Sequence, residues 1–299
     1  MQALWMVVAS LFFATMGVCV KIGSEYFNSA ELVFWRGLIG VVFMWGFARS
    51  RGVSLATAVP GMHAWRSLIG VLSLGAWFYA IAHLPLASAM TLNYMSSVWI
   101  AAFLVGGALL AWNPLKPGSA PMFQGPLVLT VIAGFAGVVL MLRPSFDQNQ
   151  GFAALVGLLS GIGAAFAYMQ VMALAKAGEP EARTVFYFAV GTAVAGALGI
   201  AAAGLSPWQW KGALWLLPMA VLASLGQLCM TRAYTHGATL VVANLQYSGI
   251  VFAAIFSIIL FGDELPLTGW AGMGLIVASG IAATVLRSRA APDSPAEEH

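Results

Sequence analysis

The sequence predicts an all-α integral membrane protein with ten transmembrane helices, arranged as two inverted five-helix repeats. Hydrophobic residues make up 61% of the 299 residues and charged residues only 8%. Soluble domains carry roughly a quarter charged residues, so this chain has too few to cover a surface that faces water. Apolar runs of about 20 residues, the length that crosses a bilayer as a helix, recur along the chain. The second half also repeats part of the pattern of the first.

Proline, glycine and charged residues set the limits of the expected helices. The run 67–115 contains no Asp, Glu, Lys or Arg and is too long for one crossing. Pro85 divides it, because proline cannot donate to a helix ladder and disfavours helix in the residue before it. We expect helices over residues 2–21, 30–49, 64–83, 86–110, 125–142, 151–175, 184–204, 213–234, 238–261 and 266–286.

The basic residues predict the orientation of the chain, because an excess of Lys and Arg marks cytoplasmic loops. With the N-terminus inside, the cytoplasmic side receives Arg49, Arg51, Arg66, Lys116, Lys176, Arg183, Arg232, Arg287 and Arg289. The outer side receives only Lys21, Arg36, Arg143 and Lys211. We therefore expect both termini in the cytoplasm and the protein in a bacterial inner membrane. The basic residues form no stripe of the kind that binds nucleic acid, so no nucleic-acid partner is expected.

The two halves of the chain are weakly self-similar. Segment 92–103 matches segment 245–256, in a register that pairs Ala80 with Ala233, His83 with His236, Asn93 with Gln246, and Tyr94 with Tyr247. Five crossings in each repeat force the second copy to enter the membrane from the opposite side. Such inverted repeats are typical of secondary transporters, with the substrate site near the midplane. We expect repeats over 1–145 and 146–287, and a disordered cytoplasmic tail over 288–299.

Four short stretches carry a resemblance to a known family. They are ATMGVCVKIG around Lys21, Phe34-Trp35-Arg36-Gly37, Leu84-Pro85-Leu86-Ala87, and the closing stretch GDELPLTGWAGMGLIVASG from Gly262. In this order they resemble the drug/metabolite transporter (DMT) superfamily, in its ten-helix EamA branch, over nearly the whole chain. The sequence departs from that pattern at residues 110–113, where an acidic residue is usual. It also has Ser96-Ser97 where the family often has a proline.

The resemblance implies a secondary transporter that moves a small organic metabolite by alternating access. An exported amino-acid-like or drug-like compound is one substrate class. The stretch 63–90 is similar to members that handle S-adenosylmethionine, so uptake or exchange of that compound or of a nucleotide-like metabolite stays open. The expected partners are a small-molecule substrate and the lipid bilayer. Monomer and homodimer both remain open, and no cofactor is expected.

Ionisable residues inside a membrane are costly, which makes them functional candidates. Arg36 lies about two turns into the second expected helix. It could neutralise a substrate carboxylate or phosphate, or it could pair with Glu31 or extend to the interface. Lys21 has the same two interpretations. Glu31 is the only acid near the interior of a crossing, so Glu31 and Lys21 are the candidates for proton coupling. Facilitated exchange is the alternative.

Amides and phenols inside apolar helices must face protein or a water-filled cavity. Asn93, Tyr94, Gln246 and Tyr247 occupy equivalent positions in the two repeats. They either line a central cavity and bind substrate, or join helices through hydrogen bonds. Aromatic side chains in the same region would suit a flat substrate, or would only pack. The further candidates for substrate binding are Trp77, Tyr79, Trp99, Tyr168, Gln170 and Gln227.

Motifs for other functions are missing from the sequence. It has no HExxH, no GxSG, and no second aspartate within a crossing to pair with Asp263, which argues against an intramembrane enzyme. No ring of charges indicates a channel. His63, His83 and His236 do not have the spacing of metal ligands, so we expect no catalytic residue and no metal site.

Overall fold

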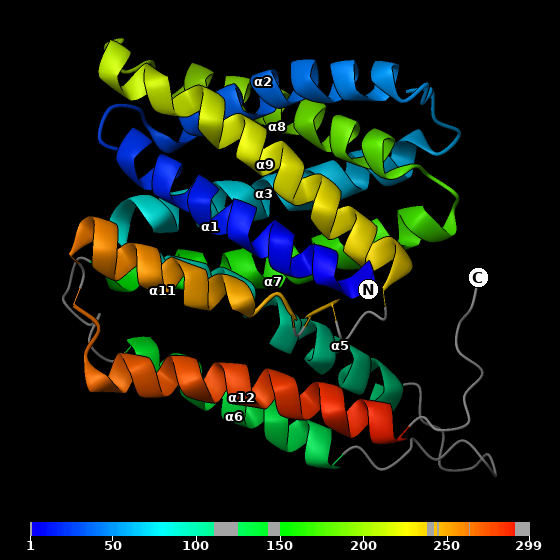
Figure 1. The fold of residues 1–299 in the computed structure, drawn as a ribbon, viewed down its shortest axis with the longest axis vertical. Helices are drawn as coiled ribbons and strands as arrows, with labels where there is room; N and C mark the ends of the chain where they lie inside the picture. Colours follow the sequence, from blue (N-terminus) through cyan, green and yellow to red (C-terminus); the bar gives the residue numbers. More distant parts are fainter. Residues whose placement is uncertain are drawn as a thin grey trace.

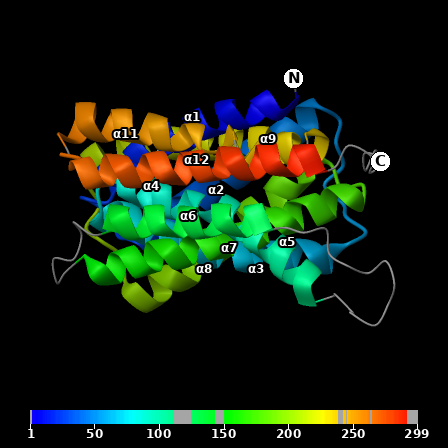
Figure 2. The same cartoon turned by 90° about the horizontal axis from the view of Figure 1, so that it is seen from below.

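The computed structural model describes residues 2–110, 125–142, 150–237, 242–243, 245–262 and 264–290. Within these residues the chain is helical and contains no β-strand, which confirms the predicted all-α class. The helices lie side by side and run back and forth along one direction (Figure 1 and Figure 2). The elements are η1 (Gln2–Leu4), α1 (Trp5–Gly23), α2 (Ser29–Ser50), α3 (Pro60–His83), α4 (Leu86–Tyr94), α5 (Ser96–Leu110), α6 (Gly125–Leu142), α7 (Gly151–Lys176), α8 (Glu181–Ala203), α9 (Trp210–His236), α11 (Ser248–Phe261) and α12 (Leu267–Ala290).

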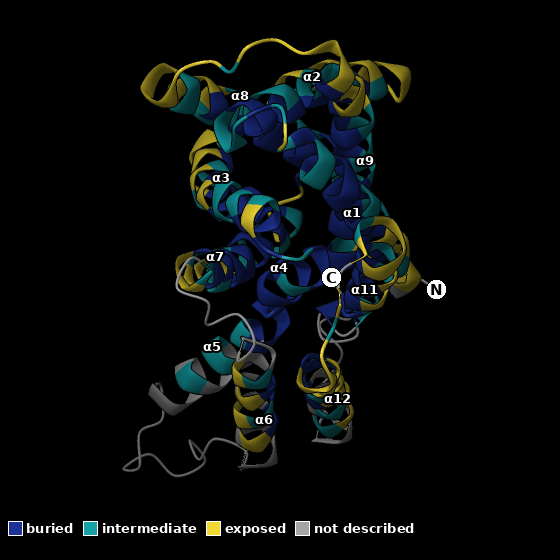
Figure 3. Cartoon of the chain, turned by 90° about the vertical axis from the view of Figure 1, so that its left-hand side faces the viewer, coloured by how far each residue is buried: buried dark blue, intermediate teal, exposed yellow. Residues whose placement is uncertain are grey.

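Six helices are long and apolar enough to cross a membrane: α1, α2, α3, α7, α8 and α9. Exposed positions lie mainly on the outward faces of the bundle (Figure 3), and many of them carry large apolar side chains. Leu72, Leu198 and Ile259, for example, are 67%, 68% and 72% exposed. Such a surface is unfavourable in water, whereas in lipid each helix satisfies its own backbone and exposes an apolar face. The chain is therefore a multi-pass membrane protein.

The expected helix over 86–110 is interrupted at Met95, which separates α4 from α5. The backbone hydrogen bonds from Met95 to Thr91 and from Trp99 to Met95 persist, so the interruption is local. Gly161 of α7 lies against the carbonyl oxygen of Leu92, where a Cβ would collide. The interruption is thus found where another helix presses on the end of α4.

The other expected helices agree with the observed ones within four residues, apart from the one over 238–261. In that segment a continuous helix begins only at Ser248, and residues 238–241 and 244 lie outside the described part. Helix α12 continues to Ala290, three residues into the segment expected to be disordered. The remaining tail, 291–299, also lies outside the described residues.

Helices from the two halves of the chain pack on one another. The closest neighbours are α2 with α8, α1 with α9, α3 with α7, and α6 with α12. Glycines permit the closest of these approaches, because Gly37 lies against the backbone of Ala193 and Gly196 against the backbone of Phe34. A Cβ at either glycine would overlap the facing helix. The α6–α12 pair lies at the other side of the bundle from α2 and α8 (Figure 1).

The bundle has two ends, which we call proximal and distal. At the proximal end, the Arg232 guanidinium near the end of α9 lies 5.1 Å from the ring centre of Trp5 at the start of α1. His236 also contacts Glu181 at the start of α8, over 3.2 Å. The starts of α1 and α8 therefore share the proximal end with the end of α9. The distal end holds the end of α1 and the start of α2.

Candidate functional site

A cavity lies inside the bundle, among α1, α3, α4, α7, α8 and α9. Its free volume is about 40 Å³, which is room for a few water molecules, since roughly 10 to 15 Å³ on this measure holds one. Its apolar walls with a few polar groups are typical of ligand sites in proteins. The cavity extends along α3 from Arg66 to Trp77, on both sides of the middle of this helix. Its polar and aromatic lining residues are Phe13, Arg66, Ser73, Trp77, Asn93, Tyr94, Tyr168, Phe188 and Gln227.

One face of α3 forms a wall of this cavity. Arg66, Gly70, Ser73, Leu74 and Trp77 all line it, and their spacing of three to four residues keeps them on one side of a helix. Gly70 leaves space for the side chain one turn before it, because a Cβ there would overlap Nη1 of Arg66. The hydroxyl of Ser73 donates to the carbonyl oxygen of Ser160 over 2.7 Å, which fixes α3 against α7.

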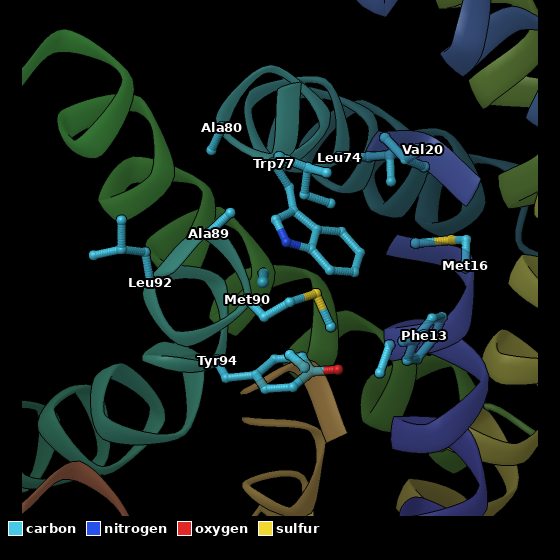
Figure 4. Packing of buried hydrophobic residues seen from close by; sticks show 14 of the residues in the cluster. Phe13, Met16, Val20, Leu74, Trp77, Ala80, Ala89, Met90, Leu92 and Tyr94 are labelled. Atoms are coloured by element: carbon cyan, nitrogen blue, oxygen red, sulfur yellow. The ribbon is translucent and has the colours of Figure 1, made fainter. Parts of the chain in front are cut away.

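Aromatic rings from α1, α3 and α4 form another part of the wall. The indole of Trp77 and the phenol of Tyr94 both point toward Phe13 on α1, and Met90 lies between them (Figure 4). Ring centres are 6.4 Å apart for Phe13 and Trp77, and 6.5 Å apart for Trp77 and Tyr94. Rings at these distances interact favourably and form a rigid surface on which a flat group can pack.

Several polar atoms at the cavity have no protein partner. Nε1 of Trp77 and the hydroxyl of Tyr94 make no hydrogen bond within the described residues. Asn93 behaves differently, since its Nδ2 donates to the hydroxyl of Ser160 over 3.1 Å. Buried polar atoms are usually hydrogen-bonded, so unpaired ones in a cavity are free to bind a ligand.

Gln246 joins helices and also holds one residue of the cavity wall. Its Nε2 donates to the hydroxyl of Tyr168 over 3.1 Å. Its Oε1 accepts hydrogen bonds from Tyr234 over 3.3 Å and from Ser97 over 3.5 Å. The rings of Tyr168 and Tyr234 stack with centres 5.4 Å apart. Gln246 thus links α5, α7 and α9 and orients Tyr168, which lines the cavity.

Two buried arginines lie next to the cavity. Arg66 lines it, and its guanidinium carbon is 4.1 Å from the ring centre of Phe188. Arg36 reaches the same ring from α2, at 5.3 Å, and does not pair with Glu31. The sequence assigned Arg66 to the cytoplasmic side, near the start of the expected helix 64–83, but it is 2% exposed. The observed α3 begins at Pro60, four residues before the expected start, so Arg66 lies in its second turn.

The predicted site residues fall into two groups. Trp77, Asn93, Tyr94, Tyr168 and Gln227 line this cavity, and their role in substrate binding stays a prediction. The others lie elsewhere, or beside it, and their roles in binding stay predictions. This second group consists of Lys21, Glu31, Arg36, Tyr79, Trp99, Gln170, Gln246 and Tyr247.

Several members of this second group have other neighbours. The ring of Tyr79 stacks on His83, with centres 4.1 Å apart, near the distal end of α3. The ring of Trp99 stacks on Phe103 at 6.2 Å. Gln170 is partly buried on α7. Nζ of Lys21 donates to the carbonyl oxygen of Leu84 over 2.6 Å and so supports the α3–α4 connection.

A carboxylate connects the two halves at the distal end. The hydroxyl of Ser206, in the α8–α9 loop, donates to Oε2 of Glu31 over 2.5 Å, and its backbone N–H donates to Oε1 over 3.0 Å. Asn28 and Glu31 also form a capping box at the start of α2. Nδ2 of Asn28 donates to the carbonyl oxygen of Gly204. We call this group of Asn28, Glu31 and Ser206 the Glu31 clasp.

A second carboxylate connects the halves at the proximal end. Glu179, in the α7–α8 loop, accepts from Nε2 of His63 over 2.9 Å and from the hydroxyl of Thr57 over 2.9 Å. Arg183 donates to both oxygens of Glu179 over 3.2 Å and to the carbonyl oxygen of Ser54 over 2.8 Å. We call this group of Thr57, His63, Glu179 and Arg183 the Glu179 clasp.

The partners of Glu179 control its ionisation. Burial opposes the charged form, but hydrogen bonds from His63, Thr57 and Arg183 outweigh burial and lower the pKa of Glu179. The carboxylate is therefore ionised at neutral pH. The ring of His63 also stacks on Tyr187 at 4.5 Å, and the hydroxyl of Tyr187 donates to the carbonyl oxygen of Leu55. The sequence did not single out this site, because its members come from two distant parts of the chain.

Metal ligands do not gather anywhere in the described part of the chain. No group of three or more His, Cys, Asp or Glu side chains there could hold a metal ion. Cys19 and Cys229 are both buried free thiols. The cavity therefore offers hydrogen-bond donors, cationic groups and aromatic faces, which suit binding of an organic molecule.

Comparisons with known proteins agree on one family. Residues 1–143 match the EamA-like transporter family. The chain is 35% identical over 279 residues to the pseudopaline exporter CntI of Pseudomonas aeruginosa, which covers 91% of this chain and 92% of that protein. It is 26% identical over 282 residues to a riboflavin transporter of Rhizobium johnstonii, covering 93% and 89% of the two chains. A crystal structure with 19% identity superposes over 96% of this chain and 98% of the other with a TM-score of 0.68, which shows the shared fold alone.

Proposed function

Since the chain belongs to the EamA-like transporter family of the DMT superfamily, we propose that it exports a small organic metabolite across a bacterial inner membrane by alternating access. Membership rests on the 35% identity to an exporter along nine-tenths of both chains. The two relatives described above are named as transporters, which confirms that the chain is a small-molecule transporter and not an enzyme. Export is the direction that the name of the 35% identical relative supports.

The proposed architecture has ten crossings in two inverted repeats, over residues 1–145 and 146–287. Four further crossings would come from α4 with α5, from α6, from the segment that ends with α11, and from α12. Packing supports this, because the contact of α1 with α9 has a counterpart in the contact of α7 with α3. The contacts of α2 with α9 and of α8 with α3 correspond in the same way. Breaks also recur at nearby positions of the two halves, at Met95 and at Gln246-Tyr247, which directly precedes the residue aligned with Met95.

The cavity is the observation that carries the proposed function. It lies at the middle of α3 and is lined from both halves, by Trp77, Asn93 and Tyr94 of the first and Tyr168 and Gln227 of the second. A site between two repeats changes its exposure when one repeat rocks against the other. Unpaired polar atoms in such a site are the groups that a substrate would satisfy.

Both ends of the bundle are closed by contacts between the halves. The Glu31 clasp joins the start of α2 to the α8–α9 loop, and the Glu179 clasp joins the α2–α3 loop to the start of α8. In the alternating-access cycle that we propose, one clasp opens at a time and the other stays formed.

The orientation that we propose places the proximal end and both termini in the cytoplasm, as the distribution of Lys and Arg predicts. The Glu179 clasp would then close the cytoplasmic side. Proton coupling through Glu31 stays a prediction, tested by whether Glu31→Gln abolishes pH-driven uphill transport. The hydrogen bonds from Asn28 and Ser206 give Glu31 a bonded role that glutamine would reproduce only in part.

Counterflow in proteoliposomes tests the proposed function. Vesicles with the purified protein are loaded with a mixture of metabolites, and exchange of labelled compound is followed by mass spectrometry. A carrier gives saturable flux that substrate on the far side accelerates. Linear flux without saturation would show a pore, and conversion of a compound without its movement would show an enzyme. Empty vesicles, and vesicles that contain protein whose two halves are cross-linked to each other, serve as controls.

A further inference from the structure

Two arginines of the first half lie deep in the protein without a counterion. Arg36 of α2 is 5% exposed and Arg66 of α3 is 2% exposed. Within the described residues neither side chain makes an ion pair or a hydrogen bond. Both guanidinium groups instead make a cation–π contact with the ring of Phe188. Burial of an unpaired charge is among the most costly arrangements in a protein, so an external partner is expected.

The buried carboxylates of the described residues are occupied elsewhere. Glu31 accepts hydrogen bonds from Asn28 and Ser206, and Glu179 accepts them from His63, Thr57 and Arg183. Both belong to the clasps at the ends of the bundle. The two arginines therefore have no carboxylate partner among the described residues, and Arg66 presents its charge to the cavity.

The surroundings of Arg66 leave its guanidinium free to bind a ligand. Its side chain lies along α3 toward Gly70, where the missing Cβ leaves space for the guanidinium. Nε and Nη1 of Arg66 lack acceptors, and so does Nε of Arg36. Arg66 lines the cavity together with Ser73, Asn93 and Tyr168. A guanidinium is a planar fork of donors that matches a carboxylate or a phosphate.

The fold does not need this charge. The register that pairs Ala80 with Ala233 places Met219 opposite Arg66 in the second half. Met219 is fully buried at that position of α9. A neutral thioether thus fills the corresponding site in one half while a guanidinium fills it in the other. Two helices of the same type pack with either residue, which points to a role for Arg66 outside packing.

We propose that Arg66 and Arg36 form a dicationic site for an organic dianion, a flat or aromatic compound that carries two carboxylate or phosphate charges. This inference rests on the proposed transport function and names its substrate class. Arg66 binds one anionic group directly from the cavity wall. Arg36, held against the same Phe188 ring, supplies the second charge. Trp77 and Tyr94 pack on the uncharged part of the compound, and the Tyr94 hydroxyl donates to it.

Binding of isophthalate tests the charge requirement without any need for the natural substrate. Isophthalate is a flat dicarboxylate, and its diamide has the same shape without charge. We expect isophthalate, and not the diamide, to raise the thermal midpoint of the purified full-length protein by mass action. Arg66→Gln and Arg36→Gln should each weaken this binding about tenfold or more, since each removes charge-assisted hydrogen bonds. Arg51→Gln, a change at an exposed arginine, should leave it unaltered.

A second variant separates a binding role from a structural one. If Arg66 serves a ligand, its burial without a counterion destabilises the unliganded protein. Arg66→Met should therefore raise the thermal midpoint by about 2 to 4 °C, and it should also abolish isophthalate binding. A lowered midpoint would assign Arg66 to folding and overturn the proposal. An equal response to isophthalate and its diamide would overturn it as well.

Flux distinguishes failure of this inference from failure of the proposed function. Saturable counterflow of neutral or cationic compounds only, unchanged in Arg66→Gln and Arg36→Gln, would refute the anion site and leave the carrier standing. Isophthalate binding that depends on both arginines, without saturable flux of any anion in the mixture, would support the site and refute the carrier. Saturable flux of dianions that Arg66→Gln removes would support both.

Discussion

A carboxylate links the two halves at each end of the bundle, near the start of α2 at one end and of α8 at the other, yet these carboxylates have different partners. Glu31 lies in the first turn of α2 and binds the α8–α9 loop, whereas Glu179 lies just before α8 and binds the α2–α3 loop. Among the described residues, Glu31 accepts from backbone N–H groups and the hydroxyl of Ser206. Glu179 accepts from an imidazole and a guanidinium, those of His63 and Arg183.

This difference shows that two carboxylates near the starts of α2 and α8 can form contacts of unequal strength between the halves. Hydrogen bonds to charged donors are about twice as strong as those to neutral ones. The Glu179 clasp should therefore resist opening more than the Glu31 clasp. In the cycle that we propose, the unliganded protein would open more often at the distal end than at the proximal end.

Locking either end should have the largest effect. Thr57→Cys with Glu179→Cys would join the proximal loops, and Glu31→Cys with Ser206→Cys the distal ones, in a background without Cys19 and Cys229. A short thiol cross-linker should remove more than about 90% of counterflow at either end, because alternating access needs each clasp to open in turn. Flux is measured before and after cross-linking, and single-cysteine variants are the controls. Full flux with one end locked would contradict alternating access.

Removal of one carboxylate should test the unequal strength. Glu179→Ala leaves His63 and Arg183 without their acceptor and should lower the free energy of unfolding by about 2 to 3 kcal/mol. Glu31→Ala should cost less, because its lost partners are neutral. Thermal unfolding in detergent gives the comparison, with Glu25→Ala at the exposed surface as the control. A larger loss for Glu31→Ala would reverse the order of the two clasps.

Acid should weaken the Glu179 clasp in a defined range. Hydrogen bonds lower the pKa of Glu179 below its ordinary value of 4.5. Its stabilising contribution is therefore complete above pH 4.5 and is lost as the pH falls through the lowered pKa. The difference in thermal midpoint between wild type and Glu179→Gln should stay constant between neutral pH and pH 4.5 and shrink below it. Loss of that difference between pH 7 and pH 6 would contradict an ionised Glu179.

The smallest effect should come from the capping residue of the Glu31 clasp. Asn28→Ala removes the hydrogen bond from the Glu31 backbone N–H to Oδ1 of Asn28, and should cost about 1 kcal/mol. Asn28→Asp keeps an acceptor at the cap and should cost clearly less in the same unfolding assay. Equal losses in both variants would show that the bond from Asn28 to Gly204 matters more than the cap.

The positions of the helices could be predicted because lipid demands long apolar segments. The break at Met95 could not, since it occurs where Gly161, 66 positions further along the chain, approaches the carbonyl oxygen of Leu92. The residues next to Gly161 and Leu92 in the sequence give no sign of this contact. Interruptions caused by another helix become visible only when the helices are packed together.

The site was partly predictable for a related reason. Trp77, Asn93 and Tyr94 stand out because polar and aromatic groups are conspicuous within apolar runs. Arg66 was missed because it was counted among the basic residues of the cytoplasmic side, although Pro60 at the first helical position was an available signal for an earlier helix start. Glu179 was missed because two of its partners, His63 and Thr57, lie more than 100 residues away. Such networks leave no local pattern.

The pairing of α6 with α12 has a consequence for experiments on motion. Gly137 of α6 lies against the carbonyl oxygen of Gly272, and Gly134 lies against the hydroxyl of Ser279, so the two helices touch along their backbones. Helices in such close contact are expected to shift together and not slide past each other. A fluorophore on this pair would thus provide a fixed reference point for single-molecule distance measurements. A second dye on the loop after α2 or after α8 would then report which mouth is open at each moment.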